Sequence, residues 1–194
     1  MRKRHALPVP PVEQLEEELN RIKYKKRYGS VFRSTIYTLM IVAAAAILIS
    51  MLIFPILNIH GSSMTPTLND GEIVICLKNA HYKEGDMIAF YYNNKILVKR
   101  VIAQSGEWVD IDKDGLVYVN GEKLEEPYVQ DLALGECDIT LPYQVPEGRV
   151  FVMGDHRSVS VDSRSTSVGC VSDEQIVGKL IFRVWPLETI GSVK

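Results

Sequence analysis

Three short segments of this chain carry side chains that could together hydrolyse an amide bond. The first, His60-Gly-Ser-Ser-Met-Thr-Pro-Thr-Leu68, is rich in hydroxyl groups. Amide hydrolysis needs a nucleophile, a base that takes its proton, and donors for the developing oxyanion. A serine hydroxyl can be the nucleophile, but a hydroxyl-rich turn explains these serines equally well when they are taken singly.

The second segment could supply the base. In residues 96–103 (ILVKRVIA), Lys99 and Arg100 are neighbours in an expected strand. Successive strand side chains point to opposite faces, so one of the two charges is expected among apolar neighbours. Burial lowers the pKa of a lysine, whereas an arginine stays protonated, so a neutral lysine could accept a proton. The alternative is an edge strand with both charges in solvent.

The third segment, residues 153–164 (MGDHRSVSVDSR), follows the expected strand 149–153. Loops at strand ends are where functional residues collect. Asp162 and Arg164 are expected to pair, and the hydroxyl groups could bind a buried amine. The alternative is an ordinary solvated loop that is held by an ion pair.

The elements that must position these segments are expected to be mostly β-strands. Short apolar runs are rich in β-branched and aromatic residues and are punctuated by Gly, Asn or Asp. Asn120-Gly121 predicts a two-residue hairpin turn, because a type I′ turn needs positive φ at both positions. The predicted strands are residues 72–78, 87–92, 96–103, 107–111, 116–119, 149–153 and 176–184.

A membrane-length apolar run precedes these strands. Residues 34–59 contain 26 residues with no ionisable group other than Tyr37. A helix from Ser34 to Phe54, just before Pro55, would be about 31 Å long, close to the thickness of the hydrocarbon core. The alternative is a core helix, but a soluble helix of this length normally shows a polar face. A cleaved signal peptide would have a shorter apolar part and a small-x-small site. The run therefore predicts a retained anchor.

The charge distribution predicts the orientation of that anchor. Residues 1–33 contain nine Lys/Arg against four Asp/Glu, and residues 60–194 contain thirteen against twenty. Positive flanks stay in the cytoplasm, so the chain is expected to be a single-pass protein of the cell membrane. We expect a basic cytoplasmic tail (1–33), a transmembrane anchor (34–59) and an extracytoplasmic β-rich domain (60–194). Apolar residues from Val12 onward recur at helical spacing, which fits a short amphipathic helix or equally a solvated tail. The first ten residues, basic and then Pro-rich, are not expected to fold by themselves.

Composition excludes other classes of function. The 194 residues have a net charge of −2, so no nucleic acid is expected as a partner. Three cysteines allow at most one intramolecular disulfide, whose pairing the sequence leaves open. Four scattered histidines show no metal-ligand spacing, so neither a metal nor another cofactor is expected. The chain is expected to be a monomer in contact with a lipid bilayer.

Taken together, the segments resemble those of the type I signal peptidases, in the single-anchor organisation typical of Gram-positive bacteria. The resemblance runs from the anchor to the C-terminus, and several motifs in the expected order are more specific than any one. It is carried by 61–68 (GSSMTPTL, like S-M-x-P-T-L), 85–90 (GDMIAF), 98–101 (VKRV), 154–164 (GDHRSVSVDSR, like G-D-N-R-D-N-S-x-D-S-R), 178–179 (GK) and 185–187 (WPL).

The resemblance implies a membrane-bound serine endopeptidase with an antiparallel β catalytic domain. It makes Ser63 the nucleophile of an acyl-enzyme mechanism and Lys99 the general base. The Ser63 backbone N–H would bind the oxyanion, and Ser160 would orient the Lys99 amine. Support roles fall to Asp155 with Arg100 and to Asp162 with Arg164.

The substrates implied are exported preproteins, which would be cut after A-x-A-type sites at the end of their signal peptides. Shallow apolar pockets would select the small side chains at the first and third positions before the cut. We expect Ile59, Ile88 and Leu97 to lie near these pockets.

The sequence departs from the family pattern at four positions. Gly61 removes a side-chain oxyanion donor that some relatives place there. His156, Ser158 and Val159 replace Asn, Asp and Asn. His156 next to Asp155 could suggest a Ser-His-Asp triad, but adjacent residues cannot easily bring an imidazole to Ser63 while the carboxylate orients it from behind.

Two other classes of protein remain as alternatives. One is the self-cleaving SOS-type repressor, which should carry a DNA-binding helical domain in place of the span. The other is a silent, membrane-anchored β-domain that binds exported proteins.

Overall fold

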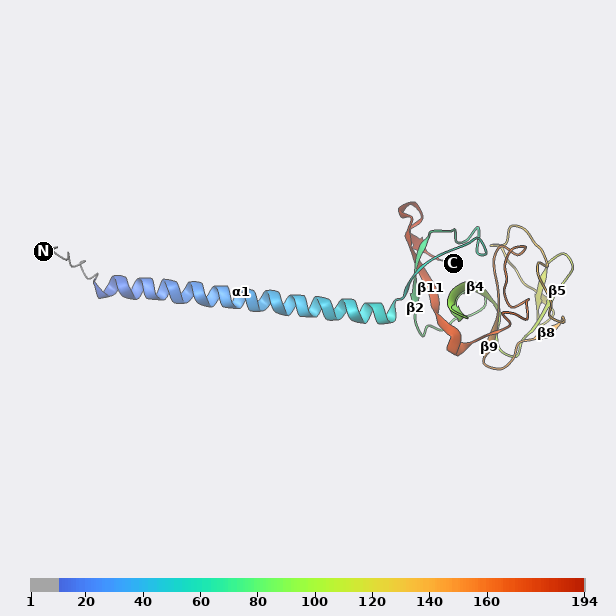
Figure 1. Cartoon of the computed structure of the whole chain (residues 1–194), viewed down its shortest axis with the longest axis horizontal. Coiled ribbons are helices and arrows are strands. Elements are labelled where there is room, and N and C mark those ends of the chain that lie inside the picture. Colours follow the sequence, from blue (N-terminus) through green and yellow to red (C-terminus); the bar gives the residue numbers. More distant parts are fainter. Residues whose placement is uncertain (1–10, 194) are drawn as a thin grey trace. The chain divides into compact units, whose positions relative to one another are not determined.

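The structure is a computed structural model, and it describes residues 11–193. The expectation for residues 1–10 lies outside the described part. The chain divides into two units between Ser50 and Met51. The first contains most of a long helix and the second contains all the strands (Figure 1). The expected fold class, antiparallel β-sheets after one N-terminal apolar helix, is confirmed.

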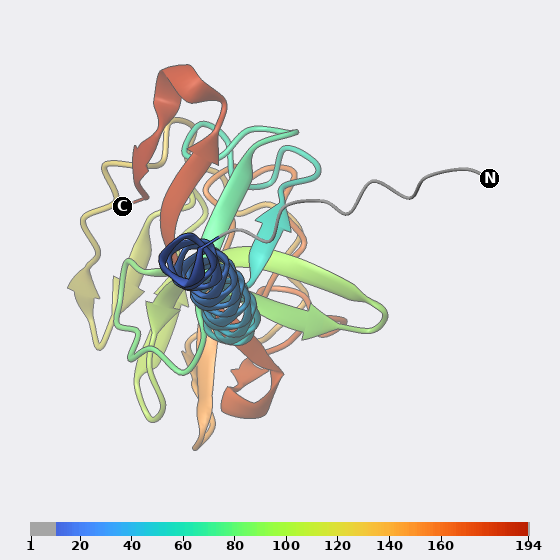
Figure 2. The same cartoon turned by 90° about the vertical axis from the view of Figure 1, so that its left-hand side faces the viewer.

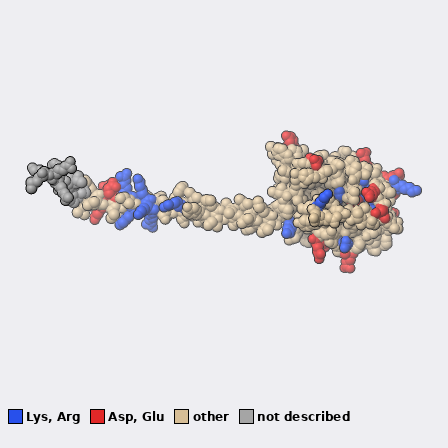
Figure 3. Space-filling view, viewed as in Figure 1, with Lys and Arg blue, Asp and Glu red and all other residues tan. Residues whose placement is uncertain are grey.

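One helix, α1 (Val12–Ile53), covers both the basic segment and most of the apolar run. The charged side chains of this helix end at Arg33, and residues 34–53 carry none (Figure 3). By length and composition it is able to cross a membrane. Thr35 and Thr38 donate their hydroxyls to the carbonyls of Val31 and Ser34, which satisfies these polar groups within the helix itself. This helix replaces the DNA-binding domain that an SOS-type repressor would need.

The helix ends two residues before Pro55, as the missing amide of a proline favours. Residues 56–58, the end of the apolar run, form the edge strand β1. Strand β1 pairs with β2, and Ile56 lies opposite Ile75. The last part of the run therefore finds its backbone hydrogen bonds in the sheet.

The larger sheet is antiparallel, with strand order β1-β2-β11-β3-β4-β9-β10, and β12 pairs with β11 (Figures 1 and 2). Its strands are β1 (Ile56–Asn58), β2 (Ile73–Leu77), β3 (Met87–Tyr92), β4 (Lys95–Ala103), β9 (Arg149–Met153), β10 (Val171–Ser172), β11 (Ile176–Trp185) and β12 (Gly191–Ser192). Two 3-10 helices, η1 (Asp173–Gln175) and η2 (Leu187–Thr189), flank β11.

The smaller sheet has the order β7-β6-β5-β8. Asn120 and Gly121 connect β6 to β7 with φ of 53° and 82°, so the predicted hairpin turn is confirmed. Residues from both sheets, such as Phe151 and Val109, share one buried cluster, which packs the smaller sheet against β4 and β9. The strands are β5 (Trp108–Ile111), β6 (Val117–Val119), β7 (Glu122–Lys123) and β8 (Tyr143–Gln144).

All seven predicted strands are present, and their ends differ by at most one residue at either end. Two of the predictions, residues 87–92 and 149–153, match to the residue. The strands that sequence patterns missed, β1, β7, β8, β10 and β12, have two or three residues each, too few for an alternating pattern to show.

Strand β4 is an interior strand between β3 and β9, and this decides the fate of its two charges. Lys99 and Arg100 are both buried, with 3% and 2% of their surfaces exposed. The alternative of an edge strand with solvated charges is therefore wrong. Lys99 and Arg100 point to opposite faces of β4, and both faces are covered. Each of the two side chains therefore needs polar partners of its own.

Two glycines with nearly equal, positive φ give a matched test of packing. Gly115 and Gly121 have φ of +84° and +82°, but a Cβ at Gly115 would lie 2.5 Å from the backbone of Ala133, whereas one at Gly121 meets open space. Gly121→Ala should lower the free energy of unfolding by about 1–2 kcal/mol through strain alone. Gly115→Ala should cost about 1–3 kcal/mol more. Equal costs in urea unfolding would contradict the close approach of the loop around Ala133.

Candidate active site

The loop that connects β1 to β2 carries Ser63 and is anchored from both ends. Ile59, Met64 and Leu68 are buried in one apolar cluster with residues of β2, β3 and β11. The Leu68 N–H donates to the Met64 carbonyl over 2.8 Å, and the Gly61 N–H donates to Asp70 Oδ1 over 2.7 Å. Ser63, between these anchors, stays half-buried.

Lys99 on β4 meets this loop. Its Nζ donates to Ser63 Oγ over 2.7 Å. Burial lowers the pKa of Lys99 to about 8, since desolvation disfavours the ammonium form more than the carboxylates of Asp162 and Asp155 favour it. The arginine Arg164 lowers the pKa further. About half of the amine is therefore uncharged near pH 8, far more than for a lysine with the usual pKa.

Arg100, the neighbour of Lys99, is paired with Asp155. Its Nε and Nη2 donate to the two carboxylate oxygens over 2.9 and 2.6 Å, and both side chains are buried. Its Nη1 donates to the Gly85 carbonyl over 2.7 Å, and the Tyr128 ring lies 3.9 Å from the guanidinium carbon. Thr67 donates its hydroxyl to Asp155 as well. The pair ties the loop after β9 to β4 and to the Ser63 loop.

Asp162 and Arg164 form a second buried pair. Arg164 Nε and Nη2 donate to the Asp162 carboxylate, each over 2.8 Å, and Asp162 Oδ2 also accepts the Gly154 N–H over 2.9 Å. Arg164 further donates to the carbonyls of Leu134 and Arg157, over 2.6 and 2.9 Å. The segment 154–164 is thus a largely buried, hydrogen-bonded structure, and its interpretation as an ordinary solvated loop is wrong.

Ser160 lies in the site but does not make the bond expected of it. Its Oγ is buried and has no hydrogen-bond partner among residues 11–193, so no bond to the Lys99 amine is present. It does lie against the loop that carries Ser63. A Cβ at Gly154 would lie 2.2 Å from Ser160 Oγ and 2.5 Å from the Ser63 carbonyl oxygen, so only glycine fits between them.

A small groove of about 110 Å³ opens beside Ser63. Ile59 and Leu97, two of the three residues expected at the substrate pockets, line it. The third, Ile88, does not line it: it is fully buried in another cluster with Phe90 and Val101. The expectation for Ile88 is therefore corrected, because its side chain is packed into that core cluster and has no exposed surface.

Sequence patterns missed one buried ion pair of the site. Arg157 is fully buried, and both its Nη atoms donate to Glu126, which lies in the loop after β7. Its Nε donates to the Gly154 carbonyl over 3.1 Å. Arg157 stood in a recognised motif, but no local pattern marked Glu126 as its partner.

His156 is not placed for a Ser-His-Asp triad. Its Nδ1 lies 3.0 Å from Thr65 Oγ1, whereas Lys99 holds the Ser63 hydroxyl. Asp155, the carboxylate that such a triad would use, is bonded to Arg100.

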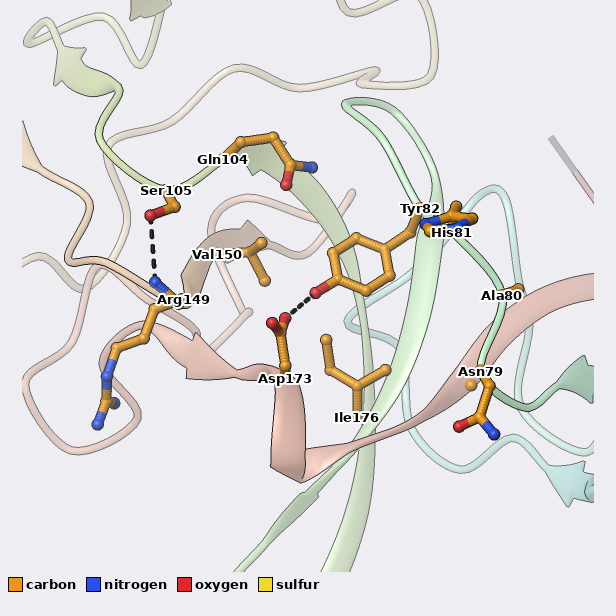
Figure 4. A pocket seen from close by; sticks show the side chains of 12 residues that line it. Asn79, Ala80, His81, Tyr82, Gln104, Ser105, Arg149, Val150, Asp173 and Ile176 are labelled. Carbon is orange, nitrogen blue, oxygen red and sulfur yellow. Dashed lines mark hydrogen bonds between the residues drawn. The ribbon is translucent and has the colours of Figure 1, made fainter.

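A separate pocket of about 400 Å³ contains neither Ser63 nor Lys99 (Figure 4). There the Tyr82 hydroxyl donates to Asp173, and the Gly148 N–H donates to Ser105 Oγ over 3.1 Å. Within residues 11–193, no three His, Cys, Asp or Glu side chains gather as a metal site, and the three cysteines are free thiols.

Known proteins resemble the chain over most of its length. The family model described as "Signal peptidase, peptidase S26" matches residues 32–185. Signal peptidase I T of Bacillus subtilis (strain 168) is 32% identical over 192 residues, covering 92% of this chain and 98% of the relative. Signal peptidase IB of Staphylococcus aureus is 41% identical over 149 residues, covering 66% and 76%. A crystal structure of a signal peptidase I from Enterococcus faecalis V583 is 33% identical, with a TM-score of 0.42, and covers 51% of this chain and 96% of that one.

A β domain after one apolar helix, with these relatives, defines the class of the protein as a protease with an N-terminal helix suited to membrane anchoring. The chain belongs to the signal peptidase family, peptidase S26. The family predicted from the sequence motifs is thereby confirmed.

The buried pair of Arg100 and Asp155 gives a stability prediction. Asp155→Asn should lower the free energy of unfolding by about 3–5 kcal/mol, because it leaves a buried guanidinium without its counter-charge. Asp86→Asn is a suitable control, since its pair with Lys179 is partly exposed and should be worth about 1 kcal/mol or less. Urea unfolding measures both costs. Similar costs would contradict the prediction that loss of the buried pair destabilises the fold more than loss of the partly exposed one.

Proposed function

We propose that the protein is a membrane-anchored endopeptidase that removes signal peptides from exported preproteins, with Ser63 as nucleophile and Lys99 as general base. The observation that carries the proposal is the 2.7 Å contact between Lys99 Nζ and Ser63 Oγ, made by a buried amine whose pKa is lowered. Family membership supplies the type of substrate, and the geometry supplies the pair of groups.

The reaction follows the Ser-Lys variant of acyl transfer. Neutral Lys99 accepts the Ser63 proton while Oγ attacks the scissile carbonyl carbon. The resulting tetrahedral intermediate collapses to an ester as the peptide bond breaks, and the Lys99 ammonium gives its proton to the leaving amine. Lys99, neutral again, then takes a proton from water, whose oxygen attacks the ester carbon. The ester bond to Ser63 Oγ breaks, the Lys99 ammonium returns that proton to Oγ, and the signal peptide leaves with a new carboxyl end.

The oxyanion is proposed to bind the Ser63 N–H. No acceptor among residues 11–193 uses this donor. Gly61 has no side-chain donor, and its own N–H is bound to Asp70, so it is not free for the oxyanion. Because the Ser63 N–H belongs to the same residue as the attacking Oγ, the loop that places Oγ also places this donor.

Ser160 is proposed to orient Lys99 during turnover. Its buried hydroxyl lacks a partner and lies against the Ser63 backbone. A buried polar group without a partner is costly, which favours a bond that forms when Lys99 becomes an ammonium and needs a further acceptor. Asp155, Arg100, Asp162 and Arg164 then act as support, since they hold the two loops that carry Ser63 and Ser160.

The groove beside Ser63 is proposed to bind the small side chains before the cut. Its volume of about 110 Å³ and its lining by Ile59 and Leu97 suit methyl-sized apolar groups better than large or charged ones. This is the selectivity that an A-x-A site requires.

The helix α1 is proposed to span the bilayer from a cytoplasmic N-terminus, with residues 1–33 in the cytoplasm, residues 34–53 in the membrane and the β domain outside. The basic side chains before the apolar segment support this orientation. Ile56 and Phe182, which both pair with Ile75, are exposed at 65% and 38%, an apolar face suited to lipid next to the end of α1. A substrate anchored in the same bilayer would meet the site by diffusion in two dimensions.

Substitution of the two reacting groups tests this function. With the full chain in detergent and a preprotein that has an A-x-A site, Ser63→Ala and Lys99→Met should each lower kcat at least about a thousandfold. Lys95→Met, an exposed lysine on the same strand, should keep wild-type turnover. Full activity of Lys99→Met would exclude the Ser-Lys mechanism.

The pH dependence tests the protonation state of the amine. Only neutral Lys99 accepts a proton, and the neutral fraction grows as pH rises through the pKa of about 8. The value of kcat/KM should therefore rise about tenfold per pH unit below that pKa and level off above it. A rate that is flat from pH 6 to 9 would argue against a titrating amine.

A further inference from the structure

We propose that His156 is a positioning residue for the reaction: it clamps the nucleophile loop from the far side of Ser63 and so fixes Oγ on Lys99. The inference rests on the proposed function, and it assigns a role to a residue that departs from the family pattern. His156 is half-buried and lies directly after Asp155.

His156 contacts the nucleophile loop through both its main chain and its side chain. Its backbone N–H donates to the Ser63 carbonyl over 3.1 Å. Its ring Nδ1 lies 3.0 Å from Thr65 Oγ1. Thr65 in turn closes a turn across the nucleophile, because its hydroxyl and its N–H both reach the Ser62 carbonyl, over 2.8 and 3.1 Å. The residues before and after Ser63 are thus joined through Thr65.

The direction of these bonds fixes the role of the imidazole. A carbonyl oxygen cannot donate, so the single hydroxyl proton of Thr65 points to the Ser62 carbonyl. The Thr65 oxygen is then an acceptor toward His156, and Nδ1 must carry the hydrogen. Both the neutral Nδ1–H form and the doubly protonated form of the ring can make this bond. His156 therefore acts here as a fixed donor and not as a base.

The support behind His156 makes the clamp rigid. Asp155 on one side is held by Arg100, and Gly154 is held by Asp162 through its N–H and by Arg157 through its carbonyl. On the other side, the Ser160 N–H donates to the His156 carbonyl over 3.1 Å. The buried ion pairs thus support the backbone on either side of the residue that contacts Ser63 and Thr65.

The nucleophile loop needs such a restraint. Gly61 and Ser62 are exposed, so between the buried Ile59 and Ser63 the loop is held by the Gly61 bond to Asp70 and not by packing. Proton transfer and attack both demand that Oγ stay within hydrogen-bond distance of Nζ, and small misplacements reduce the rate steeply. A loss of the clamp should therefore lower kcat with little change in KM, because no substrate contact is removed.

The imidazole can be exchanged without opening the core, since it borders a small polar cavity of about 150 Å³ together with Gln130 and Asp131. Three substitutions separate its two nitrogens. In His156→Asn the amide nitrogen takes the place of Nδ1, in His156→Gln it takes the place of Nε2, and His156→Ala has neither. We expect kcat to fall about tenfold in the Ala and Gln variants, the loss of about one hydrogen bond, and to return to near the wild-type value in the Asn variant.

Two further readouts separate positioning from general damage. The apparent pKa of kcat/KM should be the same in His156→Ala as in wild type, because Lys99 remains the titrating group. Thr65→Val and His156→Ala should be non-additive: the double variant should resemble Thr65→Val alone. Ser158→Ala, an exposed neighbour in the same loop, and His81→Ala, an exposed histidine elsewhere, are matched controls that should keep full turnover.

The outcomes distinguish this inference from the proposed function. Loss of activity in Ser63→Ala and Lys99→Met establishes the dyad whatever the His156 variants do. The clamp is overturned if His156→Ala keeps wild-type kcat, if Gln restores the rate and Asn does not, or if the effects of Thr65→Val and His156→Ala are additive. Loss of one limb of the pH profile in His156→Ala would instead make the imidazole a titrating participant and would also overturn it.

Discussion

A primary amine that is kept out of water and against a hydroxyl is the interaction on which the rest of this structure depends. In water, Lys99 would be protonated and useless as a base at neutral pH. Burial under the Ser63 loop lowers its pKa to about 8, and the same burial brings Nζ within 2.7 Å of Oγ. Position and proton affinity thus have one common cause, the interior location of β4.

Three arginines are buried near this amine, and each of their positive charges needs a carboxylate. Arg100, Arg157 and Arg164 are among the largest fully buried side chains, and none of them can lose its proton. Each has its own carboxylate, from Asp155, Glu126 and Asp162 respectively. The charges around Lys99 therefore act on its pKa in opposite directions, and desolvation remains the largest influence. The ion pairs therefore serve geometry, holding polar loops rigid where few apolar side chains could.

The departures from the family pattern fall where this network tolerates them. Ser158 and Val159 are exposed, so an acidic residue lost at position 158 leaves the buried pairs intact. Arg157 next to it takes its carboxylate from Glu126 in a different loop. His156, in contrast, faces the loop that carries Ser63. Its ring Nδ1 lies 3.0 Å from Thr65 Oγ1, where the side-chain amide of the usual Asn could also donate.

The sequence by itself determined the family, the apolar helix, seven strands and the Asn120-Gly121 turn, and it singled out Ser63 and Lys99, whose side chains the structure brings together. These features depend on local spacing and on motifs of adjacent residues. Only the tertiary structure decided that Lys99 and Arg100 are both buried, that Glu126 pairs with Arg157, that Ile88 is buried in the core and does not line the groove, and that Ser160 Oγ makes no bond within residues 11–193. The physical reason is that burial and pairing depend on which strands become neighbours, and strands distant in sequence are brought together by contacts that no local pattern records.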